Sequence, residues 1–195
     1  MSYNLYNTEG IIIGGQDIGE ADRVFSILTK EFGRLDILSQ EVRLLKSKLR
    51  YHLKLFSYGR FSFVGTKNFW RLTDAEELLT FDDIYKNPAK LFVAAGIANL
   101  LNRMLRGQER DIMLWQEVKQ ALLFLEKEKF VPAELKRLKL LAGLRILHHL
   151  GYIGDTASWL KLSLGQWDKQ TLEKIKDSEE KISQEINKAI KASHL

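Results

Sequence analysis

Residues 10–38 read GIIIGGQDIGEADRVFSILTKEFGRLDIL, and this stretch decides the fold. It contains short runs of β-branched and aromatic residues between glycines, a pattern typical of strands joined by tight turns. Continued to residue 64, the pattern predicts five strands, at residues 10–13, 23–29, 34–38, 53–58 and 60–64. Five short strands favour a small barrel, most commonly the oligonucleotide-binding (OB) fold, although an SH3-like barrel fits nearly as well.

After Thr80 the sequence changes from strand-like to helical patterns. Asn87 and Pro88 form a helix-start signal, and the apolar run that follows ends at Gly107. Further helices are expected at residues 109–129, 132–151 and 168–194, each with apolar residues at helical spacing. The sequence therefore predicts an α+β protein, with an N-terminal five-stranded OB-fold barrel over residues 1–80 and an α-helical bundle domain over residues 81–195.

The composition excludes several classes of protein. The chain has 195 residues, a net charge of +5 at pH 7 and no cysteine, which excludes disulfides, thiolate nucleophiles and cysteine-ligated zinc. No apolar run approaches the roughly 18 residues of a membrane span. No basic residue precedes Arg23, so no secretory signal is readable either, and we expect a cytoplasmic, nucleoid-associated protein.

Between Glu41 and Asp74 the chain carries no acidic residue. This basic window contains eight cations: Arg43, Lys46, Lys48, Arg50, Lys54, Arg60, Lys67 and Arg71. Aromatic rings are interleaved with them, at Tyr51, Phe56, Tyr58, Phe61, Phe63, Phe69 and Trp70. Cations mixed with flat rings suit a polyanion that carries stackable bases, so the window indicates a nucleic-acid-binding surface.

The simpler alternative is that these charges are only solvated and these rings only form the core. Residues 1–80 hold 11 basic and 10 acidic residues, so this part of the chain is nearly neutral as a whole. Its positive charges are concentrated in the basic window, and such a separation of charge can steer a polyanion toward one surface. Phe61 and Phe63 share one face of a strand, which we expect to be the barrel core. Tyr51, Tyr58 and Trp70 are better candidates for base stacking, because tyrosine and tryptophan tolerate half-exposed positions.

No catalytic signature is present. Glu20, Asp22 and Arg23 are adjacent in a turn, where they need only satisfy one another's charges. His148 and His149 are neighbours on a helix and point about 100° apart, which is unlike paired metal ligands. There is no Ser/His/Asp or P-loop pattern. We therefore expect a binding protein that is not an enzyme and that needs neither a cofactor nor a metal.

Several short motifs resemble one protein family in their order and spacing. They are TEGIII at 8–13, GEADR at 19–23, LT at 28–29, GRL at 33–35, Arg43, KS at 46–47 and LTDAE at 72–76. Together they resemble the bacterial DNA repair and recombination mediator RecO, and the likeness continues to LGY at 150–152. The resemblance implies an OB-fold barrel on a helical domain that binds single- and double-stranded DNA without sequence preference and anneals complementary strands.

The resemblance also implies partners. RecO proteins act with RecR and with the single-strand binding protein, and they help RecA to replace that protein on DNA. On the helix predicted at 132–151, Lys136, Arg137 and Lys139 lie beside apolar leucines. The family binds the acidic tail of the single-strand binding protein on its helical domain, so these three cations are candidate partner-binding residues. The alternative is that they only cover the solvent side of a bundle helix.

The chain departs from the family in two places. Many relatives carry a cysteine zinc site in a longer C-terminal part, so we expect a short, zinc-less variant. The family's basic loop commonly reads Lys-Gly-Ala-Arg, whereas residues 40–43 read QEVR and only the arginine carries over. This shifts the expected phosphate contacts toward the cations that follow. The full set of expected DNA-binding residues is Arg34, Arg43, Lys46, Lys48, Arg50, Tyr51, Lys54, Tyr58, Arg60, Lys67, Trp70 and Arg71.

Two other functions remain open at this level. Glu41 and the near-neutral N-terminal half are compatible with a protein-interaction adaptor that binds DNA weakly. Barrels of this kind also accept RNA, so an RNA-binding protein is the second alternative.

Overall fold

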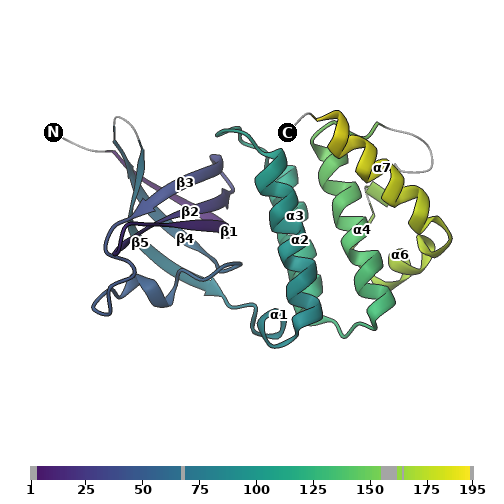
Figure 1. Cartoon of the computed structure of the whole chain (residues 1–195), viewed down its shortest axis with the longest axis horizontal. Coiled ribbons are helices and arrows are strands. Elements are labelled where there is room, and N and C mark those ends of the chain that lie inside the picture. Colours follow the sequence, from purple (N-terminus) through teal and green to yellow (C-terminus); the bar gives the residue numbers. More distant parts are fainter. Residues whose placement is uncertain (1–3, 67–68, 155–161, 164, 194–195) are drawn as a thin grey trace. The chain divides into compact units, whose positions relative to one another are not determined.

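The computed structural model describes residues 4–66, 69–154, 162–163 and 165–193 (Figure 1). The chain forms two compact units. The first contains Met1–Thr80 and Leu105–Trp115, and the second contains Phe81–Met104 and Gln116–Leu195. The predicted fold class, an N-terminal OB-type barrel followed by a helical domain, is confirmed.

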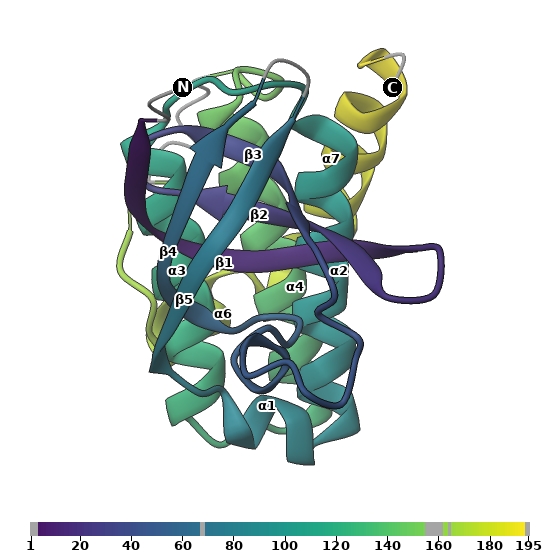
Figure 2. The same ribbon diagram turned by 90° about the vertical axis from the view of Figure 1, so that its left-hand side faces the viewer.

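The first unit is a closed five-stranded barrel (Figure 2). Its strands are β1 (Leu5–Ile18), β2 (Asp22–Thr29), β3 (Gly33–Ser39), β4 (Tyr58–Gly65) and β5 (Trp70–Leu79). Their order around the barrel is β1-β2-β3-β5-β4. The long β1 pairs with both β2 and β4, and the register shift between Ile12 and Gly14 bends it so that it can do so. A short parallel pairing of β3 with β5 closes the barrel, with Ile37 opposite Trp70.

The expected strand at residues 53–58 is wrong, and β5 was not predicted. Residues 53–57 belong instead to the β3–β4 connection, which also contains the 3-10 helix η1 (Leu49–Tyr51). Leu53 and Phe56 are both buried although they are three residues apart, and Phe56 has a φ of 64°, which interrupts an extended chain. β5 was missed because it lacks the apolar alternation that identifies a strand: it is rich in charge, and its buried residues Leu72 and Ala75 are three positions apart across a register shift.

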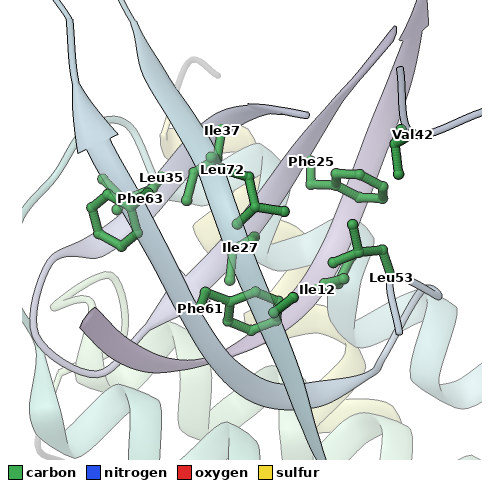
Figure 3. Close-up of a cluster of buried hydrophobic side chains, with 11 residues drawn as sticks. Ile12, Phe25, Ile27, Leu35, Ile37, Val42, Leu53, Phe61, Phe63 and Leu72 are labelled. Atoms are coloured by element: carbon green, nitrogen blue, oxygen red, sulfur yellow. The ribbon is translucent and has the colours of Figure 1, made fainter. Parts of the chain in front are cut away.

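The barrel core explains why the β3–β4 connection has a fixed place. Strand residues such as Ile12, Phe25 and Ile37 meet Val42 and Leu53 from the connection (Figure 3). Each buried apolar side chain contributes about 1.5–3 kcal/mol to folding. The connection is therefore held against the barrel by its apolar residues. Phe61 and Phe63 are also in this core, which confirms their expected placement.

The second unit is helical. Its elements are α1 (Asp82–Lys86), α2 (Pro88–Met104), α3 (Ile112–Lys127), α4 (Pro132–His149), α6 (Lys169–Lys174), η2 (Lys176–Ser178) and α7 (Glu179–Ala192). The Asn87 side chain accepts hydrogen bonds from the backbone N–H of Ala89 and Lys90, which confirms the helix-start signal. The helix expected at 168–194 is instead interrupted by η2. Among the described residues, no helix is both long enough and apolar enough to span a membrane.

One fully buried cation organises the helical unit. Arg145 on α4 is 0% exposed, and its guanidinium donates to the Glu117 carboxylate of α3 at 2.9 Å. It also donates to the carbonyls of Leu162 at 2.8 Å and Gln166 at 3.2 Å, and it lies 4.4 Å from the ring centroid of Trp167. Burial lowers the pKa of the Arg145 guanidinium, while the Glu117 charge opposes this effect. Arg145 thus joins three separate segments of the chain.

Candidate nucleic-acid interface

The β3–β4 connection, residues 40–57, displays a group of cations on one part of the barrel. Three of its apolar residues, Val42, Leu53 and Phe56, are buried, whereas Leu45 and Leu55 are exposed. Lys46, Lys48 and Lys54 are all exposed. Tyr51 is 61% exposed, as expected for a ring that could contact a base. We call Lys46, Lys48, Tyr51 and Lys54 the connection cluster.

Acidic side chains of the protein neutralise the lysines of this cluster only weakly. Lys46 lies 3.0 Å from Glu41, but both side chains are well exposed, and such a surface pair is worth only about 0–1 kcal/mol. Lys48 and Lys54 make no ion pair within the described residues. A phosphate can therefore compete for all three ammonium groups at little cost.

Arg43 has a structural role beside any contact with phosphate. Its side chain lies 3.4 Å from Asp17 and donates to the carbonyl of Gly19 at 2.9 Å, and its backbone N–H donates to the carbonyl of Ala21. Asp22 accepts a hydrogen bond from the backbone N–H of Glu41. The β1–β2 turn and the β3–β4 connection are thereby tied together. Asp17 also forms an ion pair with Arg23 at 3.2 Å.

Tyr58 is not the half-exposed ring that the sequence suggested. It is only 8% exposed, its hydroxyl donates to the Glu9 carboxylate, and its ring packs against Trp115. Burial, together with the Glu9 contact, raises the pKa of the phenol. The prediction that Tyr58 can stack on a base is therefore wrong.

Two further cations lie on the outer surface of β4 and β5. Arg60 is exposed and pairs with Glu76 on the neighbouring strand at 2.9 Å. Arg71 is exposed and makes no ion pair within the described residues. Lys67 lies outside the described residues, and so does the side chain of Arg50.

A groove on the side of the barrel unites two more of the expected residues, Arg34 and Trp70. Its volume is about 720 Å³, and we call it the barrel-side groove. β3 provides Arg34 and Asp36, the start of β5 provides Trp70, and Phe69 precedes it. The α2–α3 connector, residues 105–111, adds Arg106. Sequence reasoning missed Arg106, because nothing in the sequence links a residue after a helix to the barrel.

Six of the expected site residues thus form two groups on the barrel unit, with Lys46, Lys48, Tyr51 and Lys54 in the connection cluster and Arg34 and Trp70 in the barrel-side groove. The β3–β4 connection leads into the first residue of β4, whereas the groove includes the last residue of β4, Gly65. The connection cluster consists of lysines around one exposed tyrosine. The barrel-side groove combines arginines with a phenylalanine and a tryptophan.

The three expected partner-binding residues of α4 differ in their surroundings. Arg137 is only 7% exposed, and its guanidinium lies between the carboxylates of Glu173 and Glu179, which raise its pKa. Arg137 therefore joins α4 to α6 and α7, and its assignment as a partner-binding residue is wrong. Lys136 and Lys139 are exposed. Lys136 pairs with Glu179 at 2.7 Å, and Lys139 lies 4.2 Å from the ring centroid of Phe92.

Lys136 and Lys139 border a pocket of about 340 Å³ between α2, α4 and α7. Its other walls are largely apolar and include Ile97, Leu140 and Ile186. In the described part of the chain, no group of three His, Cys, Asp or Glu residues could hold a metal ion.

Comparison with known proteins shows what the barrel unit is similar to. Residues 1–81 match the family model described as "Recombination protein O N terminal". The chain is 27% identical over 158 residues to the DNA repair protein RecO of Acetivibrio thermocellus, covering 81% of this chain and 62% of that protein. It is 28% identical over 151 residues to the DNA repair protein RecO of Thermodesulfovibrio yellowstonii, covering 77% of this chain and 59% of that protein.

A third relative, the DNA repair protein RecO of Rubrobacter xylanophilus, is 30% identical over 123 residues, covering 63% of this chain and 49% of that protein. The resemblance that the short N-terminal motifs indicate is confirmed by these matches. The chain spans less than two thirds of the length of each of these three relatives.

Proposed function

We propose that this chain, whose residues 1–81 are of the Recombination protein O type, works in DNA repair and recombination as a DNA-binding mediator. It binds single- and double-stranded DNA without sequence preference, at the nucleoid where that DNA lies. The mechanism is contact of lysine and arginine with phosphate, assisted by exposed rings that stack on bases. No catalytic step is assigned to it.

The observation that carries this proposal is the connection cluster. Three exposed lysines stand on a segment held in place by buried apolar residues, and two of them have no acidic partner within the described residues. Because the backbone beneath these lysines is already fixed, only their side chains have to be ordered when DNA arrives, which lowers the entropic cost of binding. Because they contact phosphates and not base edges, they carry no sequence information.

Annealing of complementary strands follows from the same surface. Neutralising the phosphates of two strands reduces their mutual repulsion and lets their bases pair. We expect the protein to accelerate the pairing of two complementary labelled oligonucleotides, followed by energy transfer between their dyes. A rate equal to that of the DNA alone, with a folded protein that binds both strands, would contradict this part of the proposal.

In repair, the chain would help RecA to load on DNA covered by the single-strand binding protein, together with RecR. The pocket beside Lys136 and Lys139 supports one of these contacts. Two exposed ammonium groups border a largely apolar cavity, and an acidic peptide with an apolar end is complementary to both features. We propose that this pocket receives the tail of the single-strand binding protein.

The tail contact can be tested separately from DNA binding. Replacing Lys136 and Lys139 together by glutamate is expected to weaken binding of a labelled tail peptide by at least about tenfold, since hydrogen bonds to charged groups are worth about 1.5–3 kcal/mol. The matched control is Lys181→Glu with Lys188→Glu on α7, which makes the same change of charge outside this pocket. Equal peptide binding by the two double variants would rule the pocket out.

A further inference from the structure

The barrel-side groove is chemically different from the connection cluster. It brings two guanidinium groups, Arg34 and Arg106, into one cavity with the rings of Phe69 and Trp70. Its one carboxylate, Asp36, lies 3.3 Å from Arg34 and accepts a hydrogen bond from Ser26 at 2.5 Å. Asp36 is thus held by groups already present, and the charge that remains uncompensated in the groove is positive.

The connector wall of the groove is fixed to the barrel on both sides of Arg106. The Arg34 guanidinium donates to the carbonyl of Leu105 at 3.0 Å. On the other side, Gly33 lies so close to Glu109 that a Cβ would overlap its backbone, and its φ of 66° also favours glycine. Between these two anchors the chain turns at Gly107, whose φ is 101°. The backbone position of Arg106 is therefore determined by the barrel.

The Arg106 side chain itself is available. It is exposed, and it makes no ion pair or hydrogen bond within the described residues. Guanidinium forms two parallel hydrogen bonds with phosphate, which makes arginine well suited to this contact. Arg106 has a fixed backbone, and its guanidinium lies in the same groove as that of Arg34. The two arginines are therefore a suitable site for a phosphodiester.

The rings of the groove are also held in place. Trp70 makes T-shaped contacts with Tyr6 at 5.4 Å and Phe63 at 5.2 Å between ring centroids, and these two rings hold it in place. Phe69 is 46% exposed, and its backbone N–H and carbonyl are both hydrogen-bonded to Thr66. An exposed ring on a fixed backbone can stack on a base only if that base is not already inside a duplex.

We propose that the barrel-side groove is a site for single strands, in which Arg106 and Arg34 bind phosphate and Phe69 stacks on a base. The connection cluster, which needs only phosphate, takes single strands and duplexes alike. This assignment rests on the proposed DNA-binding function and adds a residue outside the matched region 1–81 to the interface.

The assignment of Arg106 is tested with Arg106→Ala, using a labelled single strand of about 20 thymidines and fluorescence anisotropy. For a single strand each phosphate contact contributes about 0.7 to the slope of log affinity against log salt. At about 0.1 M salt the loss of one contact therefore corresponds to about a fivefold weaker affinity. The matched control is Arg110→Ala, which removes the same charge from the same connector outside the groove and should change affinity less than twofold.

The assignment of Phe69 is tested with Phe69→Ala on the same strand and on a duplex of mixed sequence and equal length. Stacking of one base is worth about 1–3 kcal/mol, which is a loss of about 5-fold to 150-fold for the single strand. Duplex affinity should stay within about twofold. Because Phe69 is well exposed, we expect its truncation to leave the barrel folded.

The outcomes separate this inference from the function on which it rests. If the unsubstituted protein binds no DNA, the proposed function fails. If it binds DNA but Arg106→Ala equals Arg110→Ala, or Phe69→Ala weakens single strand and duplex equally, the groove assignment alone is overturned.

Discussion

Replacing Lys46, Lys48 and Lys54 together by glutamate is expected to weaken binding of a single strand by at least about 100-fold at about 0.1 M salt. Each lost phosphate contact corresponds to about fivefold under these conditions, so three contacts account for about 100-fold. The new carboxylates add repulsion to this loss. All three side chains are exposed, so circular dichroism should show an unchanged fold.

A matched triple variant separates a local surface from general charge. Lys181, Lys188 and Lys191 on α7 are also exposed, and replacing them by glutamate changes the net charge of the protein by the same amount. We expect this control to lose less than about threefold, because exposed charges beyond about 10 Å are largely screened at 0.1 M salt. Equal losses in the two triple variants would mean that net charge, and not the connection cluster, attracts DNA.

Arg145→Met is expected to have the largest effect on stability. The substitution leaves the Glu117 carboxylate, which is largely buried, without its cation, and it leaves the carbonyls of Leu162 and Gln166 without their donor. Removing one partner of a buried ion pair costs about 3–5 kcal/mol. Denaturation by urea, followed by the circular dichroism of the helices, should therefore show a clearly lower transition midpoint.

The origin of that loss can be checked with a second substitution. Adding Glu117→Leu to Arg145→Met removes the unpaired charge, so a large part of the lost stability should return. Lys181→Met, which removes an exposed cation from α7, should change the free energy of unfolding by less than about 0.5 kcal/mol. An Arg145→Met protein as stable as the Lys181→Met protein would show that this buried arginine does not hold the helical unit together.

The sequence predicted the fold where its apolar residues follow a simple period. Four of the five barrel strands, β1 to β4, and the long helices α2, α3 and α4 come from such segments. β5 was missed because its buried residues, Leu72 and Ala75, do not follow the period of two that identifies a strand. The β3–β4 connection was misread because Leu53 packs into the barrel core and Phe56 is buried although both lie in a coil, a tertiary arrangement that no local pattern reveals.

The candidate site was predicted by charge but not by geometry. The basic window correctly located exposed lysines, since a run without acidic residues has few local partners. It could not show that Tyr58 is buried against Glu9 and Trp115. Nor could it show that Arg137 lies between Glu173 and Glu179 from a later segment, or that Arg106 reaches the barrel. Each of these depends on contacts between residues more than 30 positions apart.

The salt dependence of single-strand binding tests the central claim most directly. If about six phosphates are neutralised, log affinity against log salt should fall with a slope near −4, and the triple variant of the connection cluster should have a slope about 2 units shallower. The titration is repeated with an RNA strand of matched sequence to compare the two polymers. A slope indistinguishable from zero, from a folded protein that binds the strand, would contradict an interface made by contact with phosphate.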